Sequence, residues 1–377
     1  MSTDEAAGTA TPSRTPGGPV REDVLDRIRG ATPPRRHNAR TVAALTGNPG
    51  CTRRAVLDAA GIDKPRLAER VGFPGTFGQS RFALARGNSF EAMLKADGCA
   101  LLRAVLAGAL GPAAADAGYD DLGEDADDTL TARHARTRGL LRAVDRPALV
   151  DHPLLTLDVA GRAVFLEPDL IAFQVAGRYH VVEIKSFAIV DGQADSAKVS
   201  AAAVQAAVYV LALRRLLAEL GHDEDLVSHD VVLVCPEDFS LRPTAVVLDV
   251  RKQLATLRRQ LARLSSVAGL AAALPESVGF DPARTPAELI AALHAVEARY
   301  APECLSTCEL AAFCRDEAAG CTAALGRPVR DALGGVETVA EVLAYAAGTR
   351  APDPQHAEAA ELLQAAARLR AEAQAPR

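Results

Sequence analysis

The chain has 377 residues, of which 49% are hydrophobic and 24% charged, the composition of a soluble globular protein with a sizeable core. Its net charge of −6 does not by itself indicate a nucleic-acid-binding protein. No uncharged apolar run is long enough to span a membrane, and the N-terminus lacks the apolar segment of a signal peptide. We therefore expect a cytoplasmic protein, in which cysteines are more often metal ligands or free thiols than disulfides.

The first 90 residues divide into an N-terminal stretch of low-complexity composition and a basic segment. Residues 1–20 are rich in Gly, Pro, Ser, Thr and Ala and are predicted to be disordered, within a variable N-terminal region 1–40. Residues 31–90 carry ten basic residues against three acidic ones. Such a segment can dock a phosphate backbone or simply form solvated helix faces.

Periodicity then predicts alternating helices and loops. A short helix covers residues 52–60 and ends at Gly61, a left-handed cap position. A long helix follows over about 80–110, an acidic loop over 112–128, and a further helix over about 129–144.

The centre of the chain predicts an α/β fold. Apolar, β-branched runs indicate strands at 154–159, at 164–173 and up to Lys185, with a hairpin turn at 176–178. A long helix extends to Leu220, followed by two more strands and four more helices. We place these later elements at 229–234, 244–250, 251–270, 286–299, 337–347 and 356–373. The order indicates a mixed sheet flanked by helices.

Three charged residues interrupt the apolar central strands: Asp169, Glu183 and Lys185. Burying a lone charge in a strand is costly unless the charge is paired or holds a metal. Glu183 and Lys185 are two residues apart and point to one face, and Asp169 can reach the same face from the preceding strand. Hard oxygen ligands of this kind suit Mg²⁺ or Mn²⁺.

The spacing of these residues resembles a nuclease signature. Pro168-Asp169, then Glu183-Ile184-Lys185, then Gln205 and Tyr209 four apart on one helix face, is similar to the RecB-like branch of the PD-(D/E)XK nucleases. The resemblance implies a restriction-endonuclease-like core and metal-dependent hydrolysis of DNA.

The resemblance also implies a role for each motif residue. Asp169, Glu183 and the Ile184 carbonyl would hold the metal, Lys185 would assist the chemistry, and Gln205 and Tyr209 would place the strand. RecB-like nucleases carry a G-x-x-x-[HE] element on the preceding helix, and Gly87 and Glu91 match it. Glu91 would then be a further metal ligand, although many relatives have His at that place.

Four of the seven cysteines fall within 18 residues, a density typical of a Zn²⁺ or iron–sulfur site. CRISPR-associated RecB-like exonucleases and AddB-type helicase–nuclease subunits, which this pattern resembles, bind a [4Fe–4S] cluster through one cysteine before the core and three after it. That resemblance implies the ligands Cys51, Cys304, Cys308 and Cys314, although Cys304 stands one residue off the family spacing. The alternative is a local zinc site in which Cys321 replaces Cys51.

The sequence therefore predicts a RecB-like nuclease domain over 41–325 and a C-terminal helical extension over 326–377. The resemblance implies an exonuclease that acts on single strands or free DNA ends, in DNA repair or phage defence. The chain has no G-x-x-x-x-G-K-[ST] motif, so any helicase would be a separate partner subunit. The alternative is a non-catalytic iron–sulfur protein that binds nucleic acid or acts as a scaffold.

Overall fold

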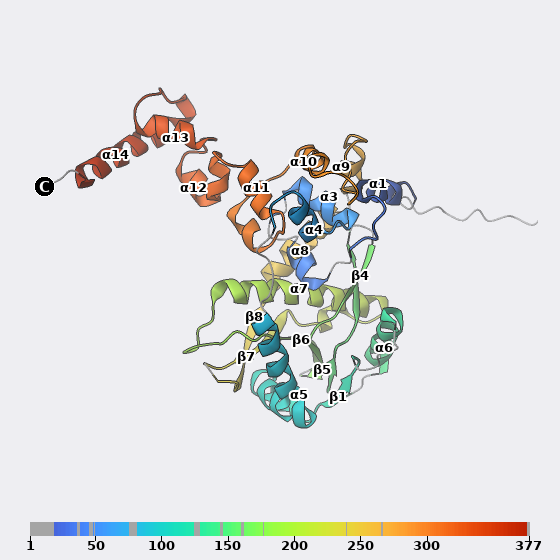
Figure 1. The fold of residues 1–377 in the computed structure, drawn as a ribbon. Coiled ribbons are helices and arrows are strands. Elements are labelled where there is room, and N and C mark those ends of the chain that lie inside the picture. The colour runs from blue at the N-terminus through green and yellow to red at the C-terminus, as the bar shows by residue number, and fades with distance from the viewer. Residues whose placement is uncertain are drawn as a thin grey trace, which may run out of the picture.

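A mixed six-stranded sheet forms the centre of the protein in the computed structural model, with helices on both of its faces and a further group of helices beyond α7 (Figure 1). The structure describes residues 19–35, 38–44, 48, 50–74, 81–123, 129–143, 146–159, 162–175, 177–238, 240–264 and 267–374. Of the N-terminal stretch 1–20 predicted to be disordered, residues 1–18 lie outside the described part of the chain.

The main sheet has the strand order β1-β2-β5-β6-β7-β8. The pairs β1/β2 and β6/β7 are parallel, and the other three pairs are antiparallel. Strands β3 and β4 form a separate hairpin. The strands span β1 Gly118–Asp121, β2 Ala148–Asp151, β3 Leu155–Val159, β4 Arg162–Leu166, β5 Leu170–Val175, β6 Arg178–Ile184, β7 Asp230–Pro236 and β8 Pro243–Asp249. The predicted α/β class with a mixed sheet is confirmed.

The helices also follow most of the predicted pattern. They span α1 Pro19–Arg29, α2 Ala39–Ala44, α3 Thr52–Ala60, α4 Lys64–Arg70, α5 Arg81–Leu110, α6 Leu130–Ala143, α7 Ser196–Glu219, α8 Arg251–Leu264, α9 Val267–Ala272, α10 Pro286–His294, α11 Ala311–Glu317, α12 Arg327–Ala332, α13 Val339–Ala346 and α14 Ala357–Gln374. Gly61 ends α3 in the left-handed conformation, with φ of 70°, as predicted.

The two faces of the sheet are covered by different helices. Val182 and Ile184 of β6 pack with the α5 residues Leu102 and Leu106. Val181, on the opposite face of the same strand, packs in the cluster that holds the buried side of α7. Glu183 shares the parity of Val181, so its side chain lies on the α7 face.

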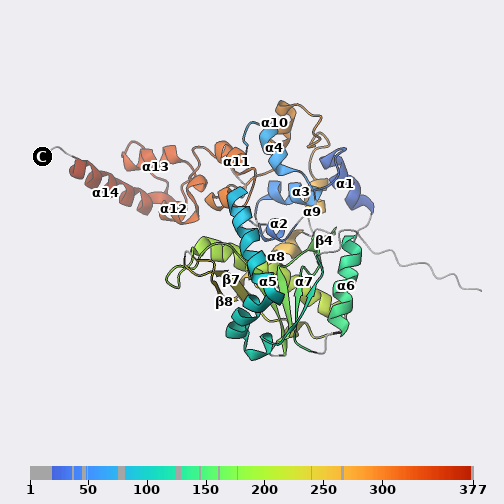
Figure 2. The same ribbon diagram turned by 60° about the horizontal axis from the view of Figure 1, so that its bottom comes forward.

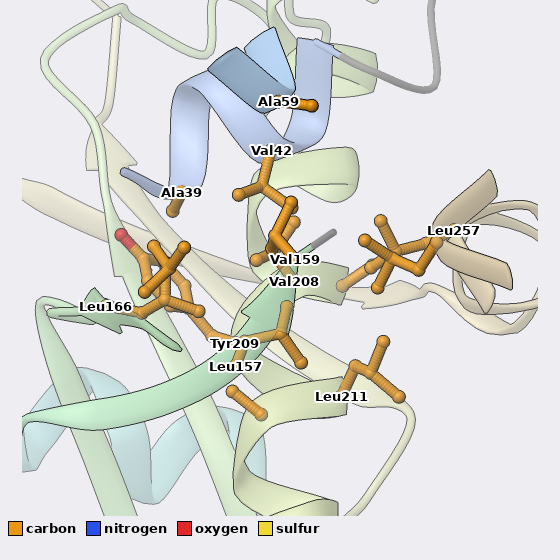
Figure 3. Close-up of a cluster of buried hydrophobic side chains, with 14 of the residues drawn as sticks. Ala39, Val42, Ala59, Leu157, Val159, Leu166, Val208, Tyr209, Leu211 and Leu257 are labelled. Atoms are coloured by element: carbon orange, nitrogen blue, oxygen red, sulfur yellow. The ribbon is translucent and has the colours of Figure 1, made fainter. Parts of the chain in front are cut away.

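Helix α7 lies between the sheet and the second group of helices. Figure 3 shows Leu157, Val159 and Leu166 of the β3–β4 hairpin meeting Val208 and Leu211 of α7. The same cluster takes in Val42, Ala59 and Leu257, from α2, α3 and α8. By length and composition α7 could cross a membrane, but 56% of its most apolar window is buried inside the protein. Its environment is that of a core helix.

Three predicted elements differ in detail. The strand expected over 164–173 is wrong as one element, because Pro168 cannot donate to a ladder and the chain divides there into β4 and β5 of different sheets. The acidic loop expected over 112–128 contains the edge strand β1, although residues 124–128 lie outside the description. The helix expected over 251–270 is two helices, α8 and α9.

Helix α5 is interrupted in its middle. Asp97, Gly98 and Cys99 have φ values of 51°, 65° and 64°, in the left-handed region. Gly98 adopts this conformation without a steric penalty, whereas the other two do so at a cost of about 1–2 kcal/mol each. The break separates the part of α5 that carries Glu91 from the part that carries Leu102 and Leu106.

The C-terminal helices α12–α14 extend away from the rest of the protein (Figure 2). They have a small buried cluster of their own, which contains Val336, Tyr345 and Ala360. The helical character predicted for residues 326–377 agrees with this arrangement as far as residue 374.

The packing of α7 can be tested by truncating a buried side chain. Leu213 is fully buried, so Leu213→Ala is expected to lower the free energy of unfolding by about 2–5 kcal/mol, through lost burial and the cavity that remains. Leu362→Ala is the matched control, because Leu362 is 63% exposed and its loss should change stability by no more than about 0.5 kcal/mol. Urea unfolding followed by circular dichroism measures both. Equal losses would contradict the core position of α7.

Candidate functional site

The β5–β6 hairpin places two predicted carboxylates side by side. Leu170 pairs with Val182, so Asp169 lies opposite Glu183 at the next position of the ladder. The Ile184 amide donates a hydrogen bond of 2.7 Å to Asp169 Oδ2. Pro168 and Asp169 lie in the short connection between β4, which ends at Leu166, and β5, which begins at Leu170. The Asp169 side chain therefore lies at the end of the main sheet.

The Glu183 carboxylate is buried with few polar partners to offset the cost of removing it from water. It is 1% exposed, and its Oε1 atom forms an ion pair with Lys185 Nζ. Its Oε2 atom is buried and accepts no hydrogen bond from any residue that the structure describes. Burial, reinforced by the charge of Asp169, raises the pKa of Glu183 to about 8. A buried carboxylate oxygen without a partner is what a cation site requires.

Asp169 and Lys185 share this environment. Burial raises the pKa of Asp169, and the charge of Lys185 offsets part of the rise. For Lys185, burial acts to lower the pKa, but the carboxylates of Glu183 and Asp169 outweigh it and leave the pKa raised. Lys185 therefore stays protonated at neutral pH.

The predicted helix residues lie next to the carboxylates. Gln205 Nε2 donates to the Tyr209 hydroxyl at 3.2 Å. Tyr209 is buried, and burial together with the charges of Glu183 and Asp169 raises its pKa well above the ordinary value. The Tyr209 hydroxyl therefore stays protonated and can donate a hydrogen bond.

Glu91 is close to this group but makes its contacts elsewhere. Its charge contributes to the raised pKa of Asp169. Its carboxylate pairs with Lys95 one turn along α5, and its Oε1 atom lies 3.7 Å from His152 Nε2. Lys95 in turn forms a 2.8 Å ion pair with the buried carboxylate of Asp151. Ligand atoms of Glu91, Asp151 and His152 all lie within 4.8 Å of one another, which makes them a possible metal group.

Sequence reasoning missed four of these neighbours. Asp151 is the last residue of the buried strand β2 and His152 follows it, and a polar pair at the end of such a run is the signal that could have identified them. Lys95 follows Glu91 by four residues, the spacing of a helical ion pair. Arg40 of α2 reaches Glu183 and Lys185 electrostatically, because its charge acts to lower the pKa of both. Arg40 belongs to the basic segment 31–90, but nothing local in the sequence distinguishes it from the other basic residues there.

The cysteines predicted as ligands come from opposite ends of the chain. Cys51 precedes α3, whereas Cys304, Cys308 and Cys314 lie near or in α11. Burial raises the pKa of Cys314 to about 12, and charge on Cys308 and Cys51 adds to the rise, so these three thiols are neighbours. Asn48 Nδ2 donates to Cys304 Sγ at 3.2 Å, so the fourth thiol lies beside the segment that leads to Cys51. Cys321, in contrast, is exposed.

Buried cations surround these thiols. The side chains of Arg53, Arg54 and Lys64 are 2–7% exposed. Arg53 Nη1 donates to Cys314 Sγ at 3.3 Å and also pairs with Glu317 at 2.6 Å. The charges of Lys64 and Arg54 counteract the burial that raises the pKa of Cys308. The arrangement can accommodate negative charge on the sulfur atoms.

No protein-family model and no curated protein matches this chain. What the structure establishes is a mixed α/β fold with several groups of side chains that could bind metal ions, among them the acidic and histidine residues at the end of the sheet and the cysteines.

The burial of Glu183 predicts a pH dependence of stability. Its pKa is about 8 in the folded protein against an ordinary 4.5, so between these values the folded state holds a proton that the unfolded chain releases. In EDTA, the wild type is therefore expected to lose stability as the pH rises from about 5 to about 8, and Glu183→Gln to lose less. Urea unfolding at several pH values measures the difference. Parallel curves for the two proteins would contradict the raised pKa.

Proposed function

We propose that this protein is a metal-dependent DNA nuclease of the RecB-like PD-(D/E)XK class. The observation that carries the proposal is the convergence of Asp169, Glu183 and Lys185 at the end of β5 and β6, with one buried oxygen of Glu183 left without a hydrogen bond among the described residues. Two carboxylates held together in this way repel each other, and a cation between them would remove that cost.

The donor set fits Mg²⁺ or Mn²⁺. Asp169 and Glu183 would supply carboxylate oxygens, and the Ile184 carbonyl, at the end of β6, would supply a neutral one. Glu91 would be a further carboxylate ligand, because its charge already acts on Asp169. A bound divalent cation polarises the scissile phosphate and lowers the pKa of water beside it.

The remaining residues would act directly on the substrate. Lys185 carries its charge at neutral pH and can stabilise negative charge that develops on the phosphate, or orient the attacking water. The Tyr209 hydroxyl, which Gln205 contacts, can donate a hydrogen bond to the strand. Arg40 would add positive charge beside the carboxylates, where a phosphate backbone has to approach.

The substrate we propose is DNA with a free end or a single strand, in DNA repair or phage defence in the cytoplasm. A helicase or another defence or repair subunit would act as a separate partner. These proposals rest on the family resemblance of the motif residues together with the position of those residues at one end of the sheet.

We further propose that Cys51, Cys304, Cys308 and Cys314 hold a [4Fe–4S] cluster. The contacts support a site shared by both ends of the chain over the local one: charge on Cys51 and Cys308 acts on Cys314, and Asn48, three residues before Cys51, donates to Cys304. Arg53, Arg54 and Lys64, which also pair with Glu317, Asp58 and Glu309, would place hydrogen-bond donors and positive charge beside the sulfur atoms of the cluster.

The nuclease proposal is tested by cleavage of end-labelled single- and double-stranded DNA with Mg²⁺ or Mn²⁺. Asp169→Asn and Lys185→Met are each expected to reduce the rate by at least about 100-fold, because one removes a metal ligand and the other the charge that assists catalysis. Lys252→Met, at an exposed lysine of α8, is the control and should cleave like the wild type. Full activity in both site variants would refute the assignment. Wild-type protein that binds DNA but never cleaves it would favour the scaffold alternative.

The cluster proposal is tested by iron and zinc analysis of anaerobically purified variants. Cys314→Ser is expected to lose iron and to lower the melting temperature, since ligation energy is part of folding. Cys321→Ser is the matched control and should retain iron, because Cys321 is exposed whereas the proposed ligands are buried or half-buried. Zinc in the wild type, or loss of metal from both the Cys314 and the Cys321 variants, would favour the local zinc site.

A further inference from the structure

We infer that His152 belongs to the metal centre, as an imidazole ligand that acts together with Glu91 and selects Mn²⁺ over Mg²⁺. This inference rests on the proposed function and adds a residue to its site. His152 lies just beyond the end of β2, next to the strand that Asp169 begins, and its amide donates to the Asp169 carbonyl at 3.5 Å. The side chain is half-buried.

The ring of His152 is oriented by the carboxylates that its two nitrogen atoms face. Nδ1 lies 3.1 Å from Asp121 Oδ1, and Nε2 lies 3.7 Å from Glu91 Oε1. If Nδ1–H donates to Asp121, the lone pair of Nε2 faces Glu91. A metal-ligating histidine almost always donates its other ring N–H to a carboxylate, which fixes the tautomer and raises the basicity of the ligand. His152 has this arrangement.

A cation already lies among these groups. Lys95 Nζ pairs with Glu91, lies 2.8 Å from Asp151 Oδ1 and lies 3.4 Å from His152 Nε2. An ammonium group donates hydrogen bonds and accepts none, so its three neighbours all present acceptors to it. The three residues around Lys95, which are Glu91, Asp151 and His152, are the ones whose ligand atoms lie within 4.8 Å of one another. A divalent cation would compete with Lys95 for Glu91 and His152.

Unlike Glu91 and His152, Asp151 has both of its carboxylate oxygens engaged in hydrogen bonds. Its Oδ2 atom accepts from the Tyr119 hydroxyl at 2.6 Å, and its Oδ1 atom accepts from Lys95 at 2.8 Å and from the His152 amide at 3.1 Å. The residue is fully buried. Because both oxygens are engaged, Asp151 is a positioning residue: it retains Lys95 when a metal takes Glu91, and it holds the backbone of His152.

The backbone around His152 is also held. Its φ of 47° lies in the left-handed region, and Arg133 Nη2 donates to its carbonyl at 3.0 Å. The same guanidinium pairs with Glu167 at 2.8 Å, immediately before Pro168-Asp169. Arg133 therefore ties the ends of β2 and β4 together, which keeps the imidazole beside the carboxylates.

An imidazole ligand changes which metal the site prefers. Mg²⁺ takes oxygen ligands, whereas imidazole favours later divalent metals, and Mn²⁺ accepts both. A centre that includes Glu91 and His152 is therefore expected to bind Mn²⁺ more tightly than Mg²⁺.

The experiment adds Mn²⁺ to the full-length protein and measures ¹⁴N coupling by pulsed electron paramagnetic resonance, with affinity from calorimetry. Asn tolerates the left-handed conformation, so His152→Asn removes the imidazole without changing the backbone. We expect the coupling of a directly bound imidazole in the wild type and its loss in His152→Asn. Affinity for Mn²⁺ should fall by about 10- to 100-fold or more, and affinity for Mg²⁺ much less.

His134→Asn is the control, because His134 is a half-buried histidine whose Nδ1 atom is engaged at 2.7 Å with the Leu154 carbonyl. It should keep both the ¹⁴N coupling and the affinity. Coupling that persists in His152→Asn, or that is equally lost in His134→Asn, would overturn the inference. If Asp169→Asn still abolished cleavage in that case, the nuclease proposal would stand without His152. A wild type that binds no Mn²⁺ and cleaves no DNA would remove both proposals.

Discussion

The burial of the Glu183 carboxylate is the constraint on which the functional end of this protein depends. A charged group at 1% exposure is tolerated in a strand only with a partner, and Lys185 is the partner that the same strand provides. One lysine leaves an oxygen without a hydrogen bond and two carboxylates in repulsion. The fold thus holds a group whose favourable state requires a further positive charge, either a proton or a metal.

Helix α7 connects this end of the sheet to the cysteines. One of its faces carries Gln205 and Tyr209 towards the carboxylates, and the same buried cluster joins it to α2, α3 and α8. The cysteines then link the two ends of the chain, since Asn48 contacts Cys304 and Arg53 contacts Cys314 across more than 250 residues. A ligand bound by these thiols would close the helical layer over α7 and stabilise the site without entering its chemistry.

The sequence predicted those features that depend on local spacing. Glu183 and Lys185 are two apart in an apolar strand, and the hairpin turn follows from the local sequence around Gly177. The register that places Asp169 opposite Glu183 also depends on a shift between Ala172 and Val175, which the sequence did not predict. A local signal marks His152 as a polar residue at the end of a strand, but its position beside Glu91 and the approach of Arg40 depend on strand order and helix packing, which no local pattern encodes. The division of the 164–173 segment at Pro168 was missed because apolar runs lie on both sides of the single proline, at 164–166 and 170–173.

Asp169 lies between two polar groups that belong to opposite layers of the fold. Lys185 acts on it from the α7 face, and Glu91 and Lys95 act on it from α5. The break at Ala96–Cys99 follows Lys95 directly, and both halves of α5 pack on the sheet, since Phe90 and Leu94 before the break share one buried cluster with Leu102 and Leu106 after it. Strained residues persist only where the surrounding structure holds them. Here that packing holds both halves of α5, and it keeps a second lysine and a third carboxylate, Lys95 and Glu91, close enough to act on Asp169.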